Sequence, residues 1–254
     1  MLMAARPDWP RVQLLSEIAD PPPAGEWVNG TAAELALKTG GRLRIDRRQG
    51  VARFAVPRLV SDSELVHPYL APVAAVVSHW YGRLSFHAGA FVAGGGVWAL
   101  VGDREAGKSS TLAWLALQGH QVVADDVLVV REGNAYAGPR SIDLRRETAE
   151  RFGVGEALGM VGARPRWRVS LPHVDAELPL RGWVFLGWDD RLEMEPLPGS
   201  RLLGELMRHL TLRVQPTCPR ALLELAMLPA FELRRPRRWE CLTETTDRLL
   251  ELAG

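Results

Sequence analysis

A glycine-rich stretch of eight residues carries the most specific chemistry in this sequence. It reads Gly102-Asp103-Arg104-Glu105-Ala106-Gly107-Lys108-Ser109 and fits G-x-x-x-x-G-K-[ST] at every fixed position. Glycines let such a loop turn its backbone N–H groups toward phosphate oxygens, and a helix starting at Lys108 adds its positive end. Lys108 supplies a mobile positive charge and Ser109 a hydroxyl ligand for Mg²⁺. The pattern therefore predicts a P-loop that binds a nucleoside triphosphate, ATP or another NTP, with magnesium. The residues predicted to contact the nucleotide are Gly102, Asp103, Arg104, Glu105, Ala106, Gly107, Lys108, Ser109 and Ser110.

Two adjacent acids are the second chemical signal. Asp125 and Asp126 end a short apolar segment about 17 residues beyond the loop. Carboxylates at that place can face the same magnesium ion and phosphate, one holding the metal while the other accepts the proton of an attacking hydroxyl. Asp also favours turns, so a structural role is the alternative. From the residues alone, either acid suits either role.

The elements around these residues predict how they are positioned. Val97–Val101 is an almost wholly apolar run, which is typical of a central strand buried on both faces. Lys108–Gln118 is predicted to be a buried helix that Gly119 ends. Further strands are predicted at Ser85–Val92, Val122–Ala124 and Val127–Val130. The order of strand, glycine loop, helix and strand ending in acid indicates an α/β P-loop core.

The rest of the chain gives weaker signals. Prolines in the first 25 or so residues predict an irregular arm. The other expected elements are a hairpin of Arg42–Asp46 and Val51–Val56, strands at Trp183–Leu186 and Glu193–Pro196, and helices at Pro72–Trp80, from a Ser200 cap onward, at Pro219–Leu228 and at Asp247–Ala253. We divide the chain into a small N-terminal α+β region, residues 1–82, and a P-loop kinase-like domain, residues 83–254.

Composition excludes several classes of protein. The chain has 254 residues, 47% apolar and 24% charged, with a formal charge of +1, so no global field recruits nucleic acid or a membrane. We find no membrane-spanning run and no signal peptide, and only Cys218 and Cys241 as thiols, which predicts a cytoplasmic protein. Lysine occurs only at Lys38 and Lys108, and every other basic residue is arginine. Because the chain otherwise uses arginine, the lysine inside the glycine loop indicates a specific role for Lys108.

Arginines crowd the stretch from Arg140 to Arg168. They could clamp phosphate or dock an acidic substrate, although a solvated face of an arginine-rich chain is the simpler interpretation. The candidates for a second tier of phosphate or substrate contacts are Arg140, Arg145, Arg166 and Arg168. Arg166 and Arg168 would share one side of a strand. Arg234–Arg238 is interpreted as a surface turn, although this basic patch could also receive an acidic peptide. Trp167, Trp183 and Trp188 either line an acceptor groove or pack in the core.

Two segments around the loop resemble a known family. Ser85-Phe86-His87-Ala88-Gly89-Ala90 precedes the loop, and Gly119-His120-Gln121-Val122-Val123-Ala124-Asp125-Asp126 follows it. Together they resemble the HPr kinase/phosphorylase family, and more closely its short relatives, which include kinases of peptide natural-product clusters. The resemblance covers about Leu84–Val130, with weaker likeness to about Leu186.

This resemblance implies a fold and a set of roles. The fold would be the HPr-kinase/PEP-carboxykinase-like central sheet flanked by helices, and the reaction phosphoryl transfer from ATP to a serine-type hydroxyl. Lys108 and Ser109 would hold phosphates and metal, Asp125 would be the general base and Asp126 a metal ligand, or these two reversed. His87 falls where the family has a histidine near the active site, and a packed histidine is the equal alternative.

The sequence also departs from the family. Asp103 and Glu105 put carboxylates beside phosphates, which is costly unless they point outward or meet cations such as Arg104. The stretch Gly138–Arg145 stands where the family has a glutamate-arginine-glycine motif, so we do not expect reverse, phosphorylase activity.

Three hypotheses follow for function. The first is a kinase acting on a peptide or small protein, and the second a kinase acting on a free amino acid or similar alcohol. The third is a nucleotide-binding regulatory or scaffold protein with weak turnover, which the acidic loop interior motivates. A deep closed pocket beside Asp125 would favour the second and an open groove the first. A homo-oligomer is compatible with the family, and nothing in the residues counts subunits.

Overall fold

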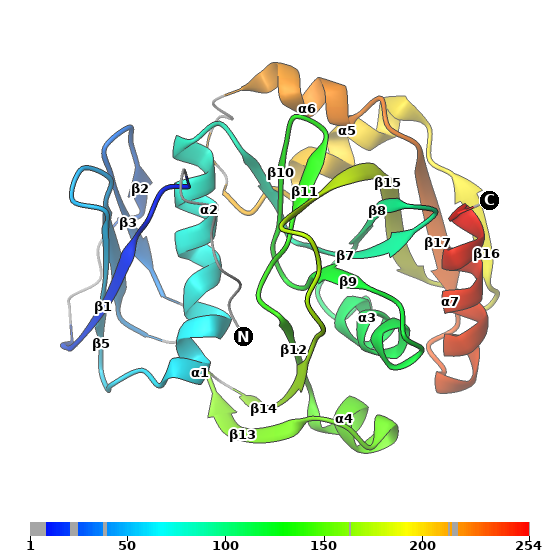
Figure 1. Cartoon of the computed structure of the whole chain (residues 1–254), viewed down its shortest axis with the longest axis horizontal. Helices are drawn as coiled ribbons and strands as arrows, with labels where there is room; N and C mark the ends of the chain where they lie inside the picture. Colours follow the sequence, from blue (N-terminus) through cyan, green and yellow to red (C-terminus); the bar gives the residue numbers. More distant parts are fainter. Residues whose placement is uncertain are drawn as a thin grey trace.

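The chain folds as a mixed α/β protein with several sheets (Figure 1). The computed structural model describes residues 9–20, 25–37, 40–162, 164–212, 214 and 218–253. Within these residues, none of the helices is long and apolar enough to cross a membrane.

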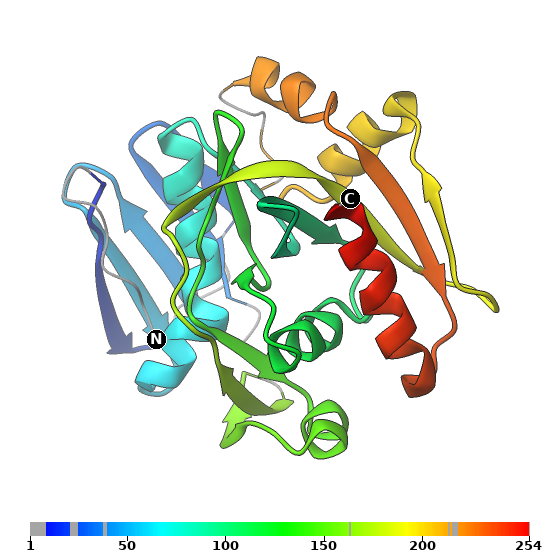
Figure 2. The same ribbon diagram turned by 45° about the vertical axis from the view of Figure 1, so that its right-hand side comes forward.

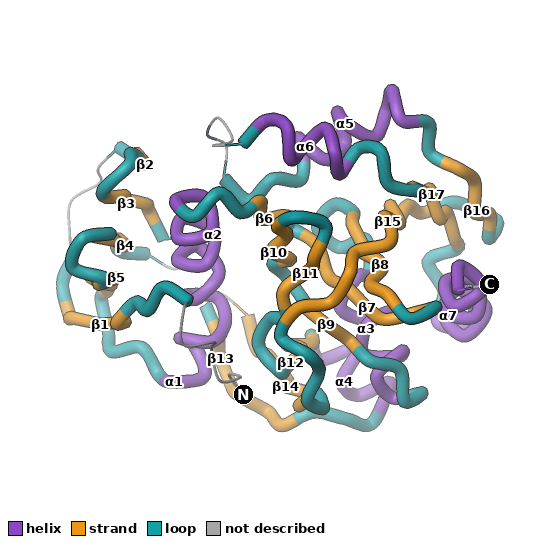
Figure 3. The backbone as a smooth tube through the Cα atoms, turned by 45° about the horizontal axis from the view of Figure 1, so that its top comes forward, coloured by secondary structure: helices purple, strands orange, loops and turns teal. Residues whose placement is uncertain are grey.

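The N-terminal region is a small sheet with one long helix packed on it. Its elements are β1 (Gln13–Ile18), β2 (Trp27–Val28), β3 (Ala32–Ala36), β4 (Arg42–Asp46), β5 (Val51–Val56), α1 (Asp62–Glu64), the π-helical turn η1 (Leu65–Tyr69) and α2 (Leu70–Trp80). The strand order is β1-β5-β4-β3-β2. Residues alternate between buried and exposed along β4, and its buried Leu43 and Ile45 pack with Val73 and Val76 of α2. Helix α2 therefore lies between this sheet and the rest of the molecule (Figures 1 and 3).

The rest of the chain is built on a nine-stranded sheet. Its strands are β6 (Leu84–Phe86), β7 (Ala88–Ala93), β8 (Gly96–Val101), β9 (Val122–Ala124), β10 (Leu128–Arg131), β11 (Asn134–Tyr136), β15 (Glu177–Trp188), β16 (Glu193–Pro196) and β17 (Ala230–Arg235). The main path is β6-β10-β11-β15-β8-β7-β9, and β17 pairs with both β15 and β16. A separate three-stranded sheet has the order β12-β14-β13, from β12 (Ser141–Leu144), β13 (Glu156–Val161) and β14 (Arg164–Ser170).

Helices cover the central sheet on both faces (Figure 2). They are α3 (Lys108–Leu117), α4 (Arg146–Phe152), α5 (Gly199–Arg208), α6 (Pro219–Leu225) and α7 (Leu242–Leu250), with short 3₁₀ turns η2 (Trp239–Cys241) and η3 (Glu251–Ala253). Leu112 of α3 and Leu249 of α7 belong to one buried apolar cluster, while Leu206 of α5 and Leu222 of α6 belong to another. Strand β8 is buried between the two clusters and contacts one on each face, which explains why it is apolar along its whole length.

Most predicted elements are confirmed, some with changed bounds. The hairpin of β4 and β5 has the predicted bounds, and the predicted helix Lys108–Gln118 ends at Leu117. Strand β15 is much longer than the predicted Trp183–Leu186. The C-terminal helix begins at Leu242, before the predicted Asp247, because Leu242 and Leu249 supply a buried face. The prediction of an irregular N-terminal arm is wrong over Gln13–Ile18, which pairs with β5 as a parallel edge strand; residues 1–8 and 21–24 lie outside the described residues.

Two further predictions are corrected. The strand predicted over Ser85–Val92 is broken at His87, whose backbone N–H donates to the His209 carbonyl at 2.8 Å instead of joining the sheet. Ser200 does not cap α5: the N-cap is Pro198 and no side chain provides a capping bond.

Candidate functional site

Strand directions bring the predicted site residues to one edge of the central sheet. Strand β7 is antiparallel to both β8 and β9, and β8, β15 and β17 are mutually parallel. The carboxyl ends of β8, β9, β15 and β17 therefore share an edge, which is where α/β sheets bind ligands. The glycine loop, residues 102–109, leaves β8 at this edge, Asp125 leaves β9, and His87 immediately precedes β7.

The glycine loop is held from inside by its own lysine. Lys108 is buried and its ammonium group donates to the carbonyls of Gly102 at 2.6 Å and Asp103 at 3.1 Å. Burial lowers the pKa of Lys108, while the charges of Asp125, Asp126 and Asp103 oppose that shift. The lysine thus ties the start of α3 to the first two residues of the loop.

Arg235, the last residue of β17, supports the loop. The interpretation of Arg234–Arg238 as a surface turn is therefore wrong for Arg234 and Arg235, which lie in β17, whereas Arg237 and Arg238 are exposed in the bend that follows. Arg235 is buried and donates to the Ala106 carbonyl at 2.8 Å, and burial lowers its pKa to about 10. It also lies over the ring of Trp188, 4.3 Å from the ring centroid. Gly107 has φ +85°, and a Cβ there would come within 2.7 Å of the Arg235 guanidinium and 3.2 Å of Trp188. Gly107 is therefore required both by backbone conformation and by space.

The acidic loop residues meet cations, as the sequence required, but Arg104 is not the partner that the structure shows. Glu105 accepts from Arg145 at 2.7 Å and lies 3.5 Å from Arg164. Asp103 lies 3.4 Å from Arg208 of α5. The hydrogen bond from Arg145 is the largest influence in lowering the pKa of Glu105.

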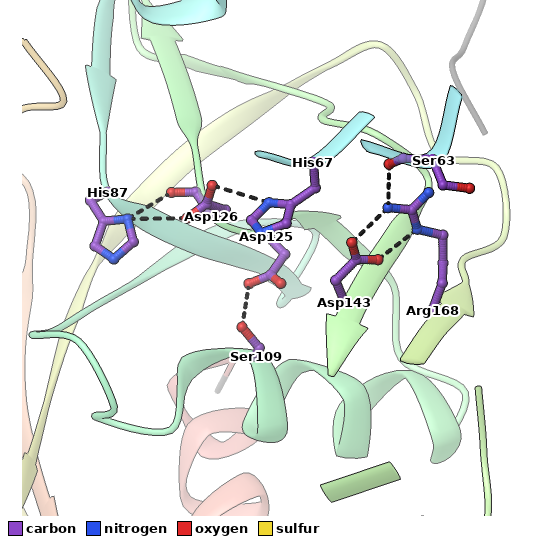
Figure 4. A network of polar contacts seen from close by, with 8 residues as sticks. All are labelled: Ser63, His67, His87, Ser109, Asp125, Asp126, Asp143 and Arg168. Atoms are coloured by element: carbon purple, nitrogen blue, oxygen red, sulfur yellow. Dashed lines mark hydrogen bonds and ion pairs between the residues drawn. The ribbon is translucent and has the colours of Figure 1, made fainter. Parts of the chain in front are cut away.

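Asp125 faces the first turn of α3. Its carboxylate accepts from the Ser109 hydroxyl at 3.1 Å (Figure 4). Burial and then the neighbouring charge of Asp126 raise the pKa of Asp125 to about 6, while the bond from Ser109 works against the shift. Asp125 is thus a carboxylate poised to exchange a proton near neutral pH.

Asp126 faces two histidines. It has φ +71°, and its carboxylate lies 3.3 Å from Nδ1 of His87 and 3.5 Å from Nδ1 of His67. Burial would raise the pKa of Asp126, but hydrogen bonds with His67 and His87 outweigh burial and lower it. The left-handed backbone lets the adjacent acids diverge, so Asp125 contacts α3 and Asp126 contacts the histidines (Figure 4).

His67 brings the N-terminal region into the site. It lies in η1 and precedes Pro68, far in sequence from every motif. Burial lowers the pKa of His67, because it disfavours the charged imidazole. The contact with Asp126 and other nearby charges outweigh burial, so the pKa of His67 is raised. No sequence pattern marks this histidine, because its partner is reached only when α2 packs beside β6.

A buried ion pair lies next to these acids. Arg168 of β14 and Asp143 of β12 form two hydrogen bonds of 2.6 Å each, and Arg168 also donates to the Ser63 carbonyl at 2.9 Å (Figure 4). Both side chains are about 5% exposed or less. The pair connects the three-stranded sheet to the segment that carries His67.

The remaining predicted arginines and tryptophans divide between the core and the cleft. The guanidinium of Arg140 is buried and donates to the carbonyls of Val122, Val123 and Pro172, so it fixes strand β9 from behind. Trp183 is fully buried in the core. Trp188 is 40% exposed and lies beside the loop, on the side opposite the acids. Arg145 and Arg166 line the same cleft as the loop.

A single large cleft joins these groups. It has a volume of about 1670 Å³, and its lining includes the glycine loop, Asp125, His67, Trp27 and Tyr136. Single small-molecule sites typically measure roughly 300–1,000 Å³. The cleft is therefore larger than one nucleotide needs, and its far wall belongs to the N-terminal region.

The oxygen donors fit a magnesium ion. Ser109 and the two aspartates offer a hydroxyl and carboxylates, the ligand types that Mg²⁺ prefers alongside water and substrate phosphates. Among the described residues no group of three or more His, Cys, Asp or Glu is arranged to hold a metal unaided. The donors present suit an ion that takes its remaining ligands from water or from a bound molecule.

Comparisons with known proteins add a limited description. No family model matches the chain, and no curated protein matches it. Among the solved structures that match is the Hpr(Ser) kinase/phosphatase from Coxiella burnetii, which is 14% identical in sequence. That match covers 67% of this chain and 99% of the other, with a TM-score of 0.32. The structure shows a mixed α/β chain whose glycine loop, acids and histidines share one cleft.

Proposed function

We propose that the chain is an ATP-dependent kinase that transfers the γ-phosphate to a serine-type hydroxyl of a peptide or small protein. The observation that carries the proposal is the contact between Ser109, at the start of the loop helix, and Asp125, at the end of β9, with Lys108 beside both. This contact brings the predicted magnesium ligand, the predicted proton acceptor and the predicted phosphate-binding lysine together at one edge of the sheet.

In the proposed reaction the acceptor hydroxyl oxygen bonds to the γ-phosphorus while the bond from that phosphorus to the β,γ-bridging oxygen breaks. Asp125 takes the hydroxyl proton, which its pKa of about 6 suits. Lys108 and the loop amides hold the phosphate oxygens. Ser109 and Asp126 would hold Mg²⁺, which when bound supplies positive charge to the phosphates.

The two aspartates have an alternative assignment. Ser109 contacts Asp125 and not Asp126, and this contact favours Asp125 as the residue near the metal. Asp126, held ionised by two histidines, would then face the acceptor. Variants separate the two assignments: loss of the base alters the pH profile of transfer, whereas loss of the ligand raises the Mg²⁺ concentration needed for half-maximal rate.

The size and walls of the cleft favour a peptide over a free amino acid. The cleft extends from Asp125 to the edge strand β2 of the N-terminal region, where Trp27 is 40% exposed. An open cleft of this volume, lined by both regions of the chain, supports the first of the three hypotheses. The acidic loop interior, which motivated a scaffold protein, is compensated by Arg145, Arg164 and Arg208.

The test is transfer from γ-labelled ATP to a pool of serine-containing peptides in the presence of Mg²⁺. We expect Asp125→Asn to lower transfer by roughly 10²-fold or more. Asp247→Asn, an exposed aspartate on α7, is the matched control and should retain wild-type transfer. Equal transfer by wild type and Asp125→Asn would remove the base assignment, and tight ATP binding with no transfer to any acceptor would support the scaffold alternative.

A further inference from the structure

Three arginines gather beside the acids without enough negative charge to neutralise them. Arg145 follows β12, and Arg164 and Arg166 lie on β14. We refer to these three residues as the arginine cluster. Arg145 and Arg164 share the one carboxylate of Glu105. Within the described residues, two of the three guanidinium groups thus share one carboxylate.

Arg166 is the member of the cluster that has no acidic partner of its own among the described residues. Its Nε is buried and has no hydrogen-bond partner in the described part of the chain. The two nearby acids have other partners, because Asp143 is paired with Arg168 and Asp126 faces two histidines. A buried donor without a partner is costly. The rest of the Arg166 side chain is half-buried and lines the cleft, so an acceptor atom of a ligand can reach the guanidinium group from there.

The position of Arg166 indicates which ligand. It is near enough to Asp126, Asp143 and His67 to interact with their charges, and it lines the cleft beside them. These groups lie on the side of the glycine loop where β9 ends, whereas Trp188 and Arg235 lie on the β15 and β17 side. If the γ-phosphate of a bound nucleotide points to the aspartates, its nucleoside lies on the Trp188 side of the loop. The acceptor then approaches the γ-phosphate from the side where Arg166 lies.

We propose that the arginine cluster binds a carboxylate of the acceptor, close to the hydroxyl that is phosphorylated, and so selects an acidic peptide. The inference rests on the proposed kinase function. The cluster already binds a carboxylate in this structure, that of Glu105, and planar guanidinium groups match that anion in two-pronged geometry. The carboxylate comes either from an Asp or Glu side chain next to the serine or from a free chain terminus.

Binding of synthetic peptides tests the proposal independently of transfer. Labelled twelve-residue peptides with one serine would carry Asp, Asn or Arg beside it, each with a C-terminal carboxylate or amide. Fluorescence polarisation with Mg²⁺-ADP present gives the affinity, and transfer from ATP is measured in parallel. We expect the Asp peptides, or all free-carboxylate peptides, to bind at least about tenfold more tightly than the neutral amides. Dependence on Asp identifies a side-chain carboxylate, and dependence on the free terminus identifies a chain end.

Variants then assign the effect to the cluster. Arg166→Gln should weaken binding of the preferred peptide by about tenfold and leave the KM for ATP within about twofold, while Arg166→Lys recovers part of the loss. Arg146→Gln, an exposed arginine adjacent to the cluster in sequence, is the matched control. Equal affinity of wild type for acidic and neutral peptides overturns the inference even if Arg166→Gln is unstable. An effect of Arg166→Gln on KM for ATP alone also overturns it, since the cluster then binds the nucleotide. Acid-dependent binding without transfer would count against the kinase function and keep the acidic ligand.

Discussion

Two carboxylates in different regions of the molecule are treated in opposite ways. Glu64, in the N-terminal region, accepts from Arg58, from the Ser61 hydroxyl and from the Ser61 backbone N–H, and the Arg58 bond is the main reason that the pKa of Glu64 falls to about 2. For Asp125, at the edge of the central sheet, burial and then the neighbouring carboxylate of Asp126 raise the pKa to about 6, and the hydrogen bond from the neutral hydroxyl of Ser109 only partly opposes this rise.

The difference suggests two roles: the charge of Glu64 stabilises the fold, whereas the charge of Asp125 is available to a ligand. Glu64 closes a capping box at the start of α1, so its ionised form is fully satisfied by its neighbours. Asp125 is less stable ionised than it would be in water, and a cation or a proton would relieve it. Strongly shifted groups in clefts are often functional for this reason.

The two regions nevertheless meet at the site. Variants of the Arg168–Asp143 pair test how much this contact contributes to the stability of the fold. Arg168→Met should lower the free energy of unfolding by about 3–5 kcal/mol, because it leaves the carboxylate of Asp143 buried without a partner and removes the bond to Ser63. Urea unfolding followed by circular dichroism and tryptophan fluorescence measures the change.

The control for that variant is the pair changed together. Arg168→Met combined with Asp143→Leu should recover much of the loss, because no unpaired charge remains. A single variant within about 1 kcal/mol of wild type would show that the pair is not buried as described.

His67 tests the contribution of the N-terminal region to chemistry. His67→Gln should lower the rate of transfer by roughly tenfold, since Asp126 loses one of two imidazole partners that orient it but keeps His87. The KM for ATP should change little, because His67 does not contact the glycine loop. His79→Gln, on α2 and outside the cleft lining, serves as the control. Unchanged transfer by His67→Gln would mean that the N-terminal region only walls the cleft.

The sequence predicted the local part of this picture. The loop, its flanking strand and helix, and the hairpin of β4 and β5 follow from short-range patterns of glycine, charge and alternation, and they are confirmed. The break at His87, the approach of His67 to Asp126 and the burial of Arg235 depend on partners far along the chain. A lone histidine or a run of arginines looks the same in a sequence whether it faces water or a buried carbonyl.

The predicted arginines divide by the same criterion. Arg140 and Arg168 share the arginine-rich stretch with Arg145 and Arg166, yet the first two are anchored to backbone carbonyls or to Asp143. Spacing indicated correctly that Arg166 and Arg168 lie on one strand, β14. It could not show which of them has an internal acid, because Asp143 comes from a different strand.

The smallest expected effects come from the two carboxylates themselves, and their signs should differ. Glu64→Gln should destabilise the fold by about 1–2 kcal/mol near pH 7, because the folded pKa of about 2 lies below the ordinary value of 4.5 and ionised Glu64 contributes stability. That contribution is complete above about pH 4.5 and is lost as pH falls toward 2. Asp125→Asn, without Mg²⁺ or nucleotide, should stabilise the fold by about 1 kcal/mol above pH 6.

The pH dependence provides the sharper comparison. The folded pKa of Asp125 lies above its ordinary 3.8, so ionisation in the folded state costs stability above about pH 6 and the cost disappears as pH falls toward 3.8. Urea unfolding between pH 4.5 and 8 should show a constant difference for Glu64→Gln and a shrinking one for Asp125→Asn as the pH is lowered. If the free energies of unfolding of the two variants followed the same pH dependence, ionised Asp125 would be as well stabilised by its neighbours as ionised Glu64. Its charge would then not be available to a ligand.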